Sequence, residues 1–240
     1  MIKLFKTTLI CVLSSMALFS CMKEQGAQIY AEVYSVVKSD GTSLYFSSDD
    51  GIDLYPAGGF NSNWGKAGDR ILVGFHYNPY TISENTTRMD ITVESLVGVQ
   101  TFGSALSSTV DTVGNGAFVF ENSSYQHAIS AWAVQNYLTA IFAIKYSTPA
   151  KHTFGFIEEP TLFKNDTLFL SLWHNTSEDG QDYTSQSHIA LELSDYGHYL
   201  LARDSTVILL KYKAENAYSS NVENYSYPVM YRRKYNVSDN

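Results

Sequence analysis

Apolar and polar side chains alternate along much of the chain after residue 27, and residues 29–36 are the first clear case. Ile29 and Ala31 occupy one set of alternating positions, and Glu32 lies on the other. A period of two is typical of a β-strand, whose successive side chains point to opposite faces. Short Asp-Gly turn sequences, such as residues 39–41, separate these stretches from one another. The pattern therefore predicts strands that are joined by tight turns.

The pattern divides the chain into two β-rich parts. Five short stretches without a helical period lie within residues 28–100 and predict a small β-barrel. Residues 101–126 are polar and turn-rich, so we expect a linker, whose apolar island 117–120 is either free chain or a docked strand. Longer stretches with regular turn signals fill residues 127–235 and predict an antiparallel β-sandwich. The expected fold class is all-β.

Two local patterns in the second part separate strand from helix. The apolar run 132–146 is long enough for a helix, but Asn136 interrupts it and β-branched and aromatic residues are frequent. We therefore expect a hairpin there. Short helical turns are expected within residues 197–202.

The first 21 residues have the layout of a secretory signal peptide. Two lysines precede an apolar run that ends at Phe19, and Ser20 stands directly before Cys21. The run is too short to cross a bilayer as a helix, which takes about 20 apolar residues. A cysteine at the cleavage site resembles the signal of bacterial lipoproteins. We therefore expect residues 1–20 to be removed, Cys21 to be lipidated and residues 21–27 to form a tether.

The expected location follows from the same segment. The lipid on Cys21 would hold the exported protein to a membrane, and the next residue, Met22, is not the Asp that acts as a retention signal. We therefore expect an outer-membrane lipoprotein. The periplasmic face and the cell surface both remain open as its location.

Charge and cysteine usage exclude several classes of function. The chain has 16 Lys and Arg residues against 24 Asp and Glu, and loss of Lys3 and Lys6 with the leader would leave 14 against 24, or −10. A net field of this sign does not attract nucleic acid or anionic headgroups. Cys11 would leave with the leader and Cys21 would carry lipid, so no thiol remains for a disulfide or for catalysis.

Several stretches spread along the chain carry a family resemblance. They are Cys21 and the stretches 44–57, 67–73, 131–138 and 169–175. In these stretches the chain resembles the NigD-like lipoproteins of Bacteroidetes. The resemblance implies an OB-like N-terminal barrel followed by a C-terminal β-sandwich. The function of the family is largely unknown, its name suggests bacteriocin immunity, and no catalytic residues carry over from it.

The chain contains no motif for catalysis or for a cofactor. Gly-x-Ser-x-Gly, a phosphate loop and a dinucleotide fingerprint are all missing from the sequence, and its histidines form no close pair. His174 and His188 would face each other across a hairpin with Asp179 and Asp182 in its loop, but strand-edge histidines of an exposed hairpin are favoured over a metal site. We expect no enzyme activity, no metal and no cofactor.

Aromatic residues provide the remaining candidate site. Trp64 lies in a polar loop with Asn61 and Asn63, whereas Trp132 and Trp173 are expected to fill the core. Loops at the mouth of an OB-like barrel often bind ligands, so Trp64, Asn61 and Asn63 are the candidate ligand-binding residues. We predict a non-enzymatic, lipid-anchored envelope protein that binds a protein or peptide partner. A carbohydrate-binding surface lipoprotein with a glycan partner and a bacteriocin-immunity-type protein are the alternatives.

Overall fold

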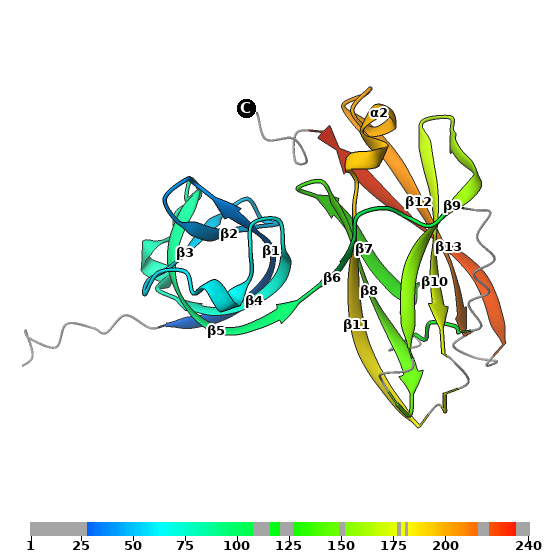
Figure 1. Ribbon diagram of the computed structural model, residues 1–240, viewed down its shortest axis with the longest axis horizontal. Helices are drawn as coiled ribbons and strands as arrows, with labels where there is room; N and C mark the ends of the chain where they lie inside the picture. The colour runs from blue at the N-terminus through cyan, green and yellow to red at the C-terminus, as the bar shows by residue number, and fades with distance from the viewer. Residues whose placement is uncertain are drawn as a thin grey trace, which may run out of the picture. The chain divides into compact units, whose positions relative to one another are not determined.

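The computed structural model describes residues 28–107, 116–120, 127–148, 152–176, 179–180, 182–215 and 221–233. The expected signal peptide, Cys21 and the tether lie outside the described residues. The described chain is nearly all β-structure, as predicted (Figure 1). It divides into two compact units, with the main break after Val97, and the short segment Gly68–Ile71 is grouped with the second unit. No helix in the described residues is long and apolar enough to cross a membrane.

The first unit contains a closed barrel with the strand order β1-β2-β3-β5-β4, which confirms the expected small barrel. Its elements are β1 (Ile29–Ser39), β2 (Leu44–Ser48), β3 (Asp53–Pro56), the 3₁₀ turn η1 (Ser62–Trp64), β4 (Arg70–Tyr77), the 3₁₀ turn η2 (Pro79–Thr81) and β5 (Arg88–Gly98). Side chains on the inward faces of the strands fill the barrel, and Val37, Phe46, Leu54 and Val73 are buried.

The second unit is a sandwich of two four-stranded sheets with the orders β13-β12-β10-β9 and β6-β11-β8-β7. Its elements are β6 (Gln100–Phe102), β7 (Ile129–Val134), β8 (Tyr137–Tyr146), β9 (Thr153–Lys164), β10 (Thr167–Asn175), β11 (Tyr183–Glu192), η4 (Ser194–Tyr196), α2 (Gly197–Leu200), β12 (Ser205–Glu215) and β13 (Val222–Arg232). Residues such as Leu138, Leu170, Leu191 and Leu210 form the core between the sheets. The sandwich and the short helical turn at α2 confirm the prediction.

Two hairpins of the sandwich use the same kind of turn. Gln135 and Asn136 join β7 to β8 with φ values of 51° and 67°, and Asn165 and Asp166 join β9 to β10 with φ values of 49° and 61°. Two consecutive residues with positive φ match the twist of a tight hairpin, and Asn and Asp tolerate this conformation. The hairpin expected within residues 132–146 is therefore confirmed.

The pairing departs from a purely antiparallel sandwich in two places. β10 pairs with β12 in parallel, and β6 pairs with β11 in parallel. The intervening strand β11 belongs to the other sheet, so the chain returns to the sheet of β10 in the same direction as it left. Parallel neighbours need such a crossover, which alternating turn signals do not reveal.

The stretch 101–126, expected as a linker, contributes its described residues to the sandwich. Leu106 forms a bridge with Ile157 of β9, and Phe118 forms one with Ala214 of β12. Val119 bridges to Ala143, so the apolar island is docked. The sequence left open whether the apolar island is free chain or a docked strand, and the burial of Phe118 and Val119 holds it on the sheets.

Candidate functional site

Trp64, the main candidate from the sequence, packs against other aromatic rings of the barrel. Its ring lies edge-on to Phe60, with centroids 5.6 Å apart, and 6.3 Å from Phe46. Asn61 accepts a hydrogen bond from the backbone N–H of Asn63 at 2.9 Å, which caps the turn η1. Part of the indole therefore serves the packing of the barrel. The role of these three residues in ligand binding stays a prediction.

His174 does not face His188, as the sequence suggested, but lies beside His152. His174 lies next to His152, with Nε2 2.7 Å from Nδ1 of His152, and Nε2 of His152 lies 3.1 Å from Oδ2 of Asp179. His188 faces Ile141 across the pairing of β11 with β8. His152 directly precedes β9, His174 lies on β10 and Asp179 follows β10, and the spacing of histidines along the sequence does not reveal that these groups meet.

This Asp179–His152–His174 chain joins two loops at one end of the sandwich. Asp179 accepts hydrogen bonds from the backbone N–H groups of Thr148 and Ser147 at 2.6 and 2.8 Å. The side chains of His152 and Asp179 are 2% and 3% exposed, so these hydrogen-bonded groups are closed to solvent. Burial, followed by the neighbouring His152, lowers the pKa of His174 to about 4. No group of three or more His, Cys, Asp or Glu side chains among the described residues is arranged to hold a metal ion.

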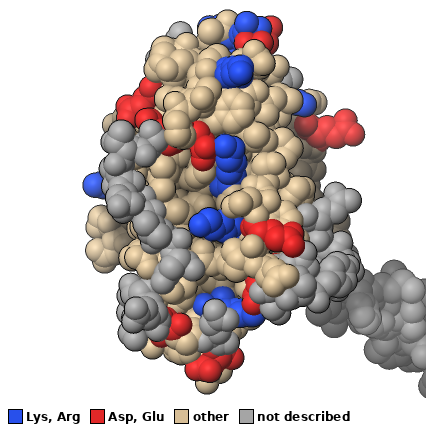
Figure 2. Space-filling model, turned by 90° about the vertical axis from the view of Figure 1, so that its right-hand side faces the viewer, with Lys and Arg blue, Asp and Glu red and all other residues tan. Residues whose placement is uncertain are grey.

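The outward face of the sheet β13-β12-β10-β9 is hollowed by a groove of about 600 Å³. Figure 2 looks onto this side of the second unit, where Lys and Arg side chains follow one another down a largely uncharged face. Leu172 of β10 and Tyr212 of β12 point into the core. Because successive side chains of a strand point to opposite faces, the polar side chains next to them in the sequence point outward. Side chains that line the groove include Glu159, Ser171, Trp173, Lys211, Lys213 and Asn224.

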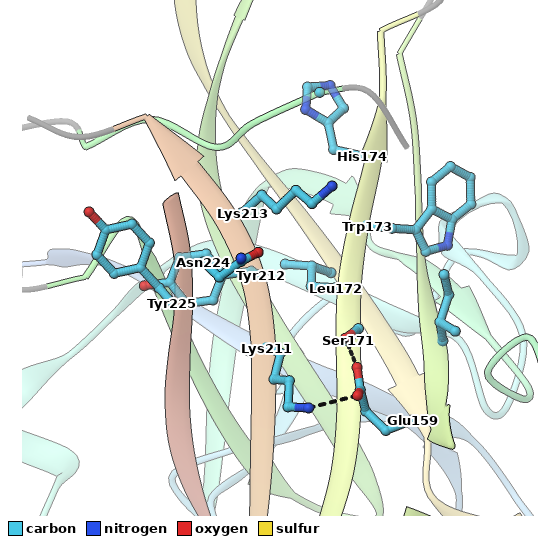
Figure 3. A pocket seen from close by; sticks show the side chains of 12 residues that line it. Glu159, Ser171, Leu172, Trp173, His174, Lys211, Tyr212, Lys213, Asn224 and Tyr225 are labelled. Atoms are coloured by element: carbon cyan, nitrogen blue, oxygen red, sulfur yellow. Dashed lines mark hydrogen bonds and ion pairs between the residues drawn. The ribbon is translucent and has the colours of Figure 1, made fainter. Parts of the chain in front are cut away.

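The two lysines of the groove have different surroundings (Figure 3). Nζ of Lys211 lies 2.7 Å from Oε2 of Glu159, and the hydroxyl of Ser171 donates to the other oxygen of that carboxylate. Partial burial acts to raise the pKa of Glu159, but the bonds from Lys211 and Ser171 outweigh it and the pKa is lowered. Lys213 is exposed and forms none of the ion pairs found between described residues.

Trp173 forms one wall of the groove, which corrects its expected place in the core. It alternates with the buried Leu172 and His174 and therefore points outward. Its cross-strand neighbour is Gly155, and a Cβ atom built there would lie 2.5 Å from Nε1 of the indole. The missing side chain at Gly155 therefore lets the ring approach β9 closely.

Gly155→Ala is expected to move Trp173 and to lower the free energy of unfolding by about 1–3 kcal/mol, because the added methyl group overlaps the indole. Urea unfolding followed by tryptophan fluorescence measures both effects. Gly103→Ala is the matched control, since nothing lies within 4 Å of a Cβ atom at that position. Equal stability of the two variants would contradict the packing of Trp173 over Gly155.

A comparison with protein families identifies the second unit. Residues 123–225 match the NigD-like C-terminal beta sandwich domain. The sandwich is a NigD-like C-terminal domain. This match confirms the resemblance to the NigD-like family, and the groove lies on the outward face of the NigD-like domain. No curated protein sequence matches the chain.

Solved structures share the fold over nearly the whole chain. A candidate lipoprotein of Bacteroides fragilis NCTC 9343 has a TM-score of 0.63 and 12% identity, covering 85% of this chain and 99% of its own. A protein of unknown function from Bacteroides vulgatus ATCC 8482 has a TM-score of 0.60 and 15% identity, with coverage of 88% and 96%. A NigD-like immunity protein from Bacteroides caccae ATCC 43185 has a TM-score of 0.54 and 16% identity, with coverage of 85% and 97%. At these identities the likeness shows a common fold.

Proposed function

We propose that the protein is a lipid-anchored envelope protein that binds a protein or peptide partner on the outward face of its NigD-like domain. The groove beside Trp173, Lys211 and Lys213 is the observation that carries this proposal. It combines an aromatic wall, two ammonium groups and polar side chains on a rigid sheet. Large aromatic side chains with polar surroundings are typical of protein interfaces.

The chemistry of the groove supports binding rather than catalysis. Glu159 is the one carboxylate among the described side chains of its lining, and both of its oxygens are engaged, one by Ser171 and one by Lys211. A general acid or base needs a pKa near the working pH, whereas these bonds lower the pKa of Glu159 below its ordinary acidic value. The side chain therefore suits a structural role.

The leader and the fold relatives support the place of action. Ser20-Cys21 ends a sequence typical of lipoprotein export. The Bacteroides fragilis relative carries the description of a candidate lipoprotein, and that from Bacteroides caccae is called a NigD-like immunity protein. Immunity to a bacteriocin, reached by binding a protein partner, would be one specific form of the proposed function. In that form, deletion of the protein would sensitise the producing cells to their own bacteriocin.

Site-specific crosslinking in living cells tests the proposal. A photoreactive p-benzoylphenylalanine in place of Asn224, which lines the groove, is expected to capture an envelope protein that mass spectrometry identifies. The same residue in place of Lys164 is the control, because Lys164 is an exposed residue of the same sheet that does not line the groove. The captured protein, once purified, is expected to bind the full chain.

Three outcomes would oppose the proposal or a part of it. Equal capture from positions 224 and 164, or no capture from either, would count against a partner in the groove. Cys21→Ala in the same strain is expected to release the protein from the membrane and to reduce the capture, because the anchor no longer holds it near its partner. Unchanged membrane attachment of Cys21→Ala would remove the lipid anchor from the proposal.

A further inference from the structure

The outward face of the groove-bearing sheet is ordered in rows that cross its strands. Phe169, Leu209 and Pro228 form one row through the pairings of β10 with β12 and of β12 with β13. Ser171 and Lys211 form the next row, and Lys213 with Asn224 the row after that. Because outward side chains recur at every second residue, the face changes from apolar to cationic over five residues of β12.

The two lysines set a spacing. Lys211 and Lys213 are two residues apart on one strand, so their Cα atoms lie about 6.6 Å apart. An extended peptide has the same repeat, and its side chains at alternate positions share one face. Carboxylates at every second position of an extended segment therefore match the two ammonium groups one to one.

The charge of the groove selects an anionic occupant. The chain as a whole carries a net charge of −8, whereas the groove has two lysines against the single carboxylate of Glu159 among its described lining residues. Lys213 is exposed, and Lys211 shares its charge with Glu159. A local cationic site in an acidic protein attracts acidic groups only where the lysines lie, which favours a defined register.

The row beside Lys211 adds an apolar requirement. Nζ of Lys211 lies 6.0 Å from the centre of the Phe169 ring, so the lysine stem covers part of this row. Leu209 and its partner Pro228 continue it, and Met230 on the next row is 51% exposed. An apolar residue of the partner, two positions beyond the carboxylate that faces Lys211, would rest on this surface and remove apolar area from water.

We propose that the groove binds an extended acidic segment of a partner protein, in which two carboxylates at alternate positions face Lys213 and Lys211 and an apolar side chain two positions further faces Leu209. This inference rests on the proposed function and specifies the chemistry of the partner. The segment has five positions: the first and third are acidic, the fifth is apolar, and the second and fourth can be any residue. The pattern can run in either chain direction. Glu159 pairs with Lys211, and the incoming carboxylate shares or replaces that contact.

Isothermal titration of the full chain in detergent with short blocked peptides tests the inference. The probes are Glu-Thr-Glu-Thr-Leu and its reversed order, with Thr-Thr-Glu-Glu-Leu and Lys-Thr-Lys-Thr-Leu as controls. One of the two alternating acidic peptides is expected to bind best, and its affinity is expected to fall as salt is raised. The adjacent-glutamate peptide is expected to bind more weakly and the lysine peptide not at all.

Three variants assign the binding to the groove. Lys213→Ala is expected to weaken binding of the best peptide about 5-fold, while Lys164→Ala, with the same charge change outside the groove, changes it less than about 2-fold. Glu159→Gln is expected to strengthen binding about 3-fold, because it removes the carboxylate that competes for Lys211. A gain of affinity cannot come from misfolding, so this variant keeps the test meaningful.

The inference is overturned if no peptide binds, if Lys164→Ala weakens binding as much as Lys213→Ala, or if Glu159→Gln weakens it. It is also overturned if polygalacturonate binds the groove more tightly than the peptides, which would indicate an acidic glycan. These results are separable from the crosslinking experiment. A protein captured from position 224 whose contact segment is not acidic would leave the proposed function standing and remove this inference.

Discussion

Phe118→Ala is expected to lower the free energy of unfolding of the second unit by about 3–5 kcal/mol. The ring is 1% exposed and lies 4.7 Å from Phe142, 5.6 Å from His174 and 6.3 Å from Tyr212, measured between ring centroids. Truncation would leave a cavity in the middle of the core, which the two sheets cannot close without moving together. The effect follows from both lost burial and lost ring contacts.

The backbone around Phe118 adds to this effect because it bonds to both sheets. Its N–H donates to the carbonyl of Lys213, and its carbonyl accepts from the N–H of Glu215, both on β12. The next residue, Val119, donates to the carbonyl of Ala143 on β8 of the other sheet. Loss of the ring therefore weakens a segment that ties the two sheets together.

Hydrogen exchange read out by mass spectrometry measures this prediction, because peptides from the second unit report on that unit alone. Phe120→Ala is the matched control: Phe120 is half-buried and contacts the ring of Tyr225 at 5.6 Å. We expect its effect to be well below that of Phe118→Ala. Similar effects of the two variants would contradict the central place of the Phe118 ring in the core.

Acidification from pH 6.5 to pH 4 is expected to destabilise the second unit through His174. Its pKa is about 4 in the folded protein against 6.5 in the unfolded chain, because it is buried and lies beside His152. In this window the unfolded chain binds a proton that the folded protein does not, so the free energy of unfolding falls as the pH falls. This difference between the two pKa values corresponds to a loss of about 3 kcal/mol in the free energy of unfolding once the pH has fallen to the lower pKa.

His174→Phe is expected to flatten the pH dependence between pH 6.5 and 4, since Phe fills the same aromatic stack with Phe118 and Phe154 and does not titrate. Urea unfolding at a series of pH values measures the slope. A residual slope of the same sign is expected from His188, whose pKa is also lowered by burial. An unchanged slope in His174→Phe would contradict this assignment.

Asp179 adds a separate acid step at lower pH. Backbone N–H groups, that of Thr148 first and that of Ser147 next, hold the pKa of Asp179 well below its ordinary value of 3.8 despite the opposing effect of burial. Its contribution is complete above pH 3.8 and is lost only as the pH falls below that value. Asp179→Asn is therefore expected to remove the loss of stability below pH 3.8 and to leave the loss through His174 between pH 6.5 and 4 in place.

The fold could be read largely from side-chain periodicity. Alternation predicted the strands, Asn136 marked a turn, and the barrel and the sandwich followed from strand number and spacing. The parallel pairing of Thr167 with Val207 could not be read, because it depends on which sheet the intervening strand joins. The docking of Phe118 was left open for a similar reason, since polar neighbours mask a single buried side chain.

The groove was missed because it forms from strands that are distant in the sequence. Trp173 was expected in the core from its residue type, although it alternates with Leu172 and His174, which are more buried. The two lysines on β12 alternate with Tyr212 in the same way, so the outward cationic positions were readable on that strand. What could not be read is the register that brings Lys211 beside Ser171.

The parallel pairing of β6 with β11 also imposes an order on folding in time. Gln100 pairs with Ile189, so this sheet cannot be completed until the chain as far as β11 is available. Contacts between residues so far apart in the sequence form slowly, because a long loop must close first. The barrel, whose strands all lie within residues 29–98, needs no such wait. In a chain that emerges from its N-terminus, the barrel would therefore be able to close while the second unit is still unfolded.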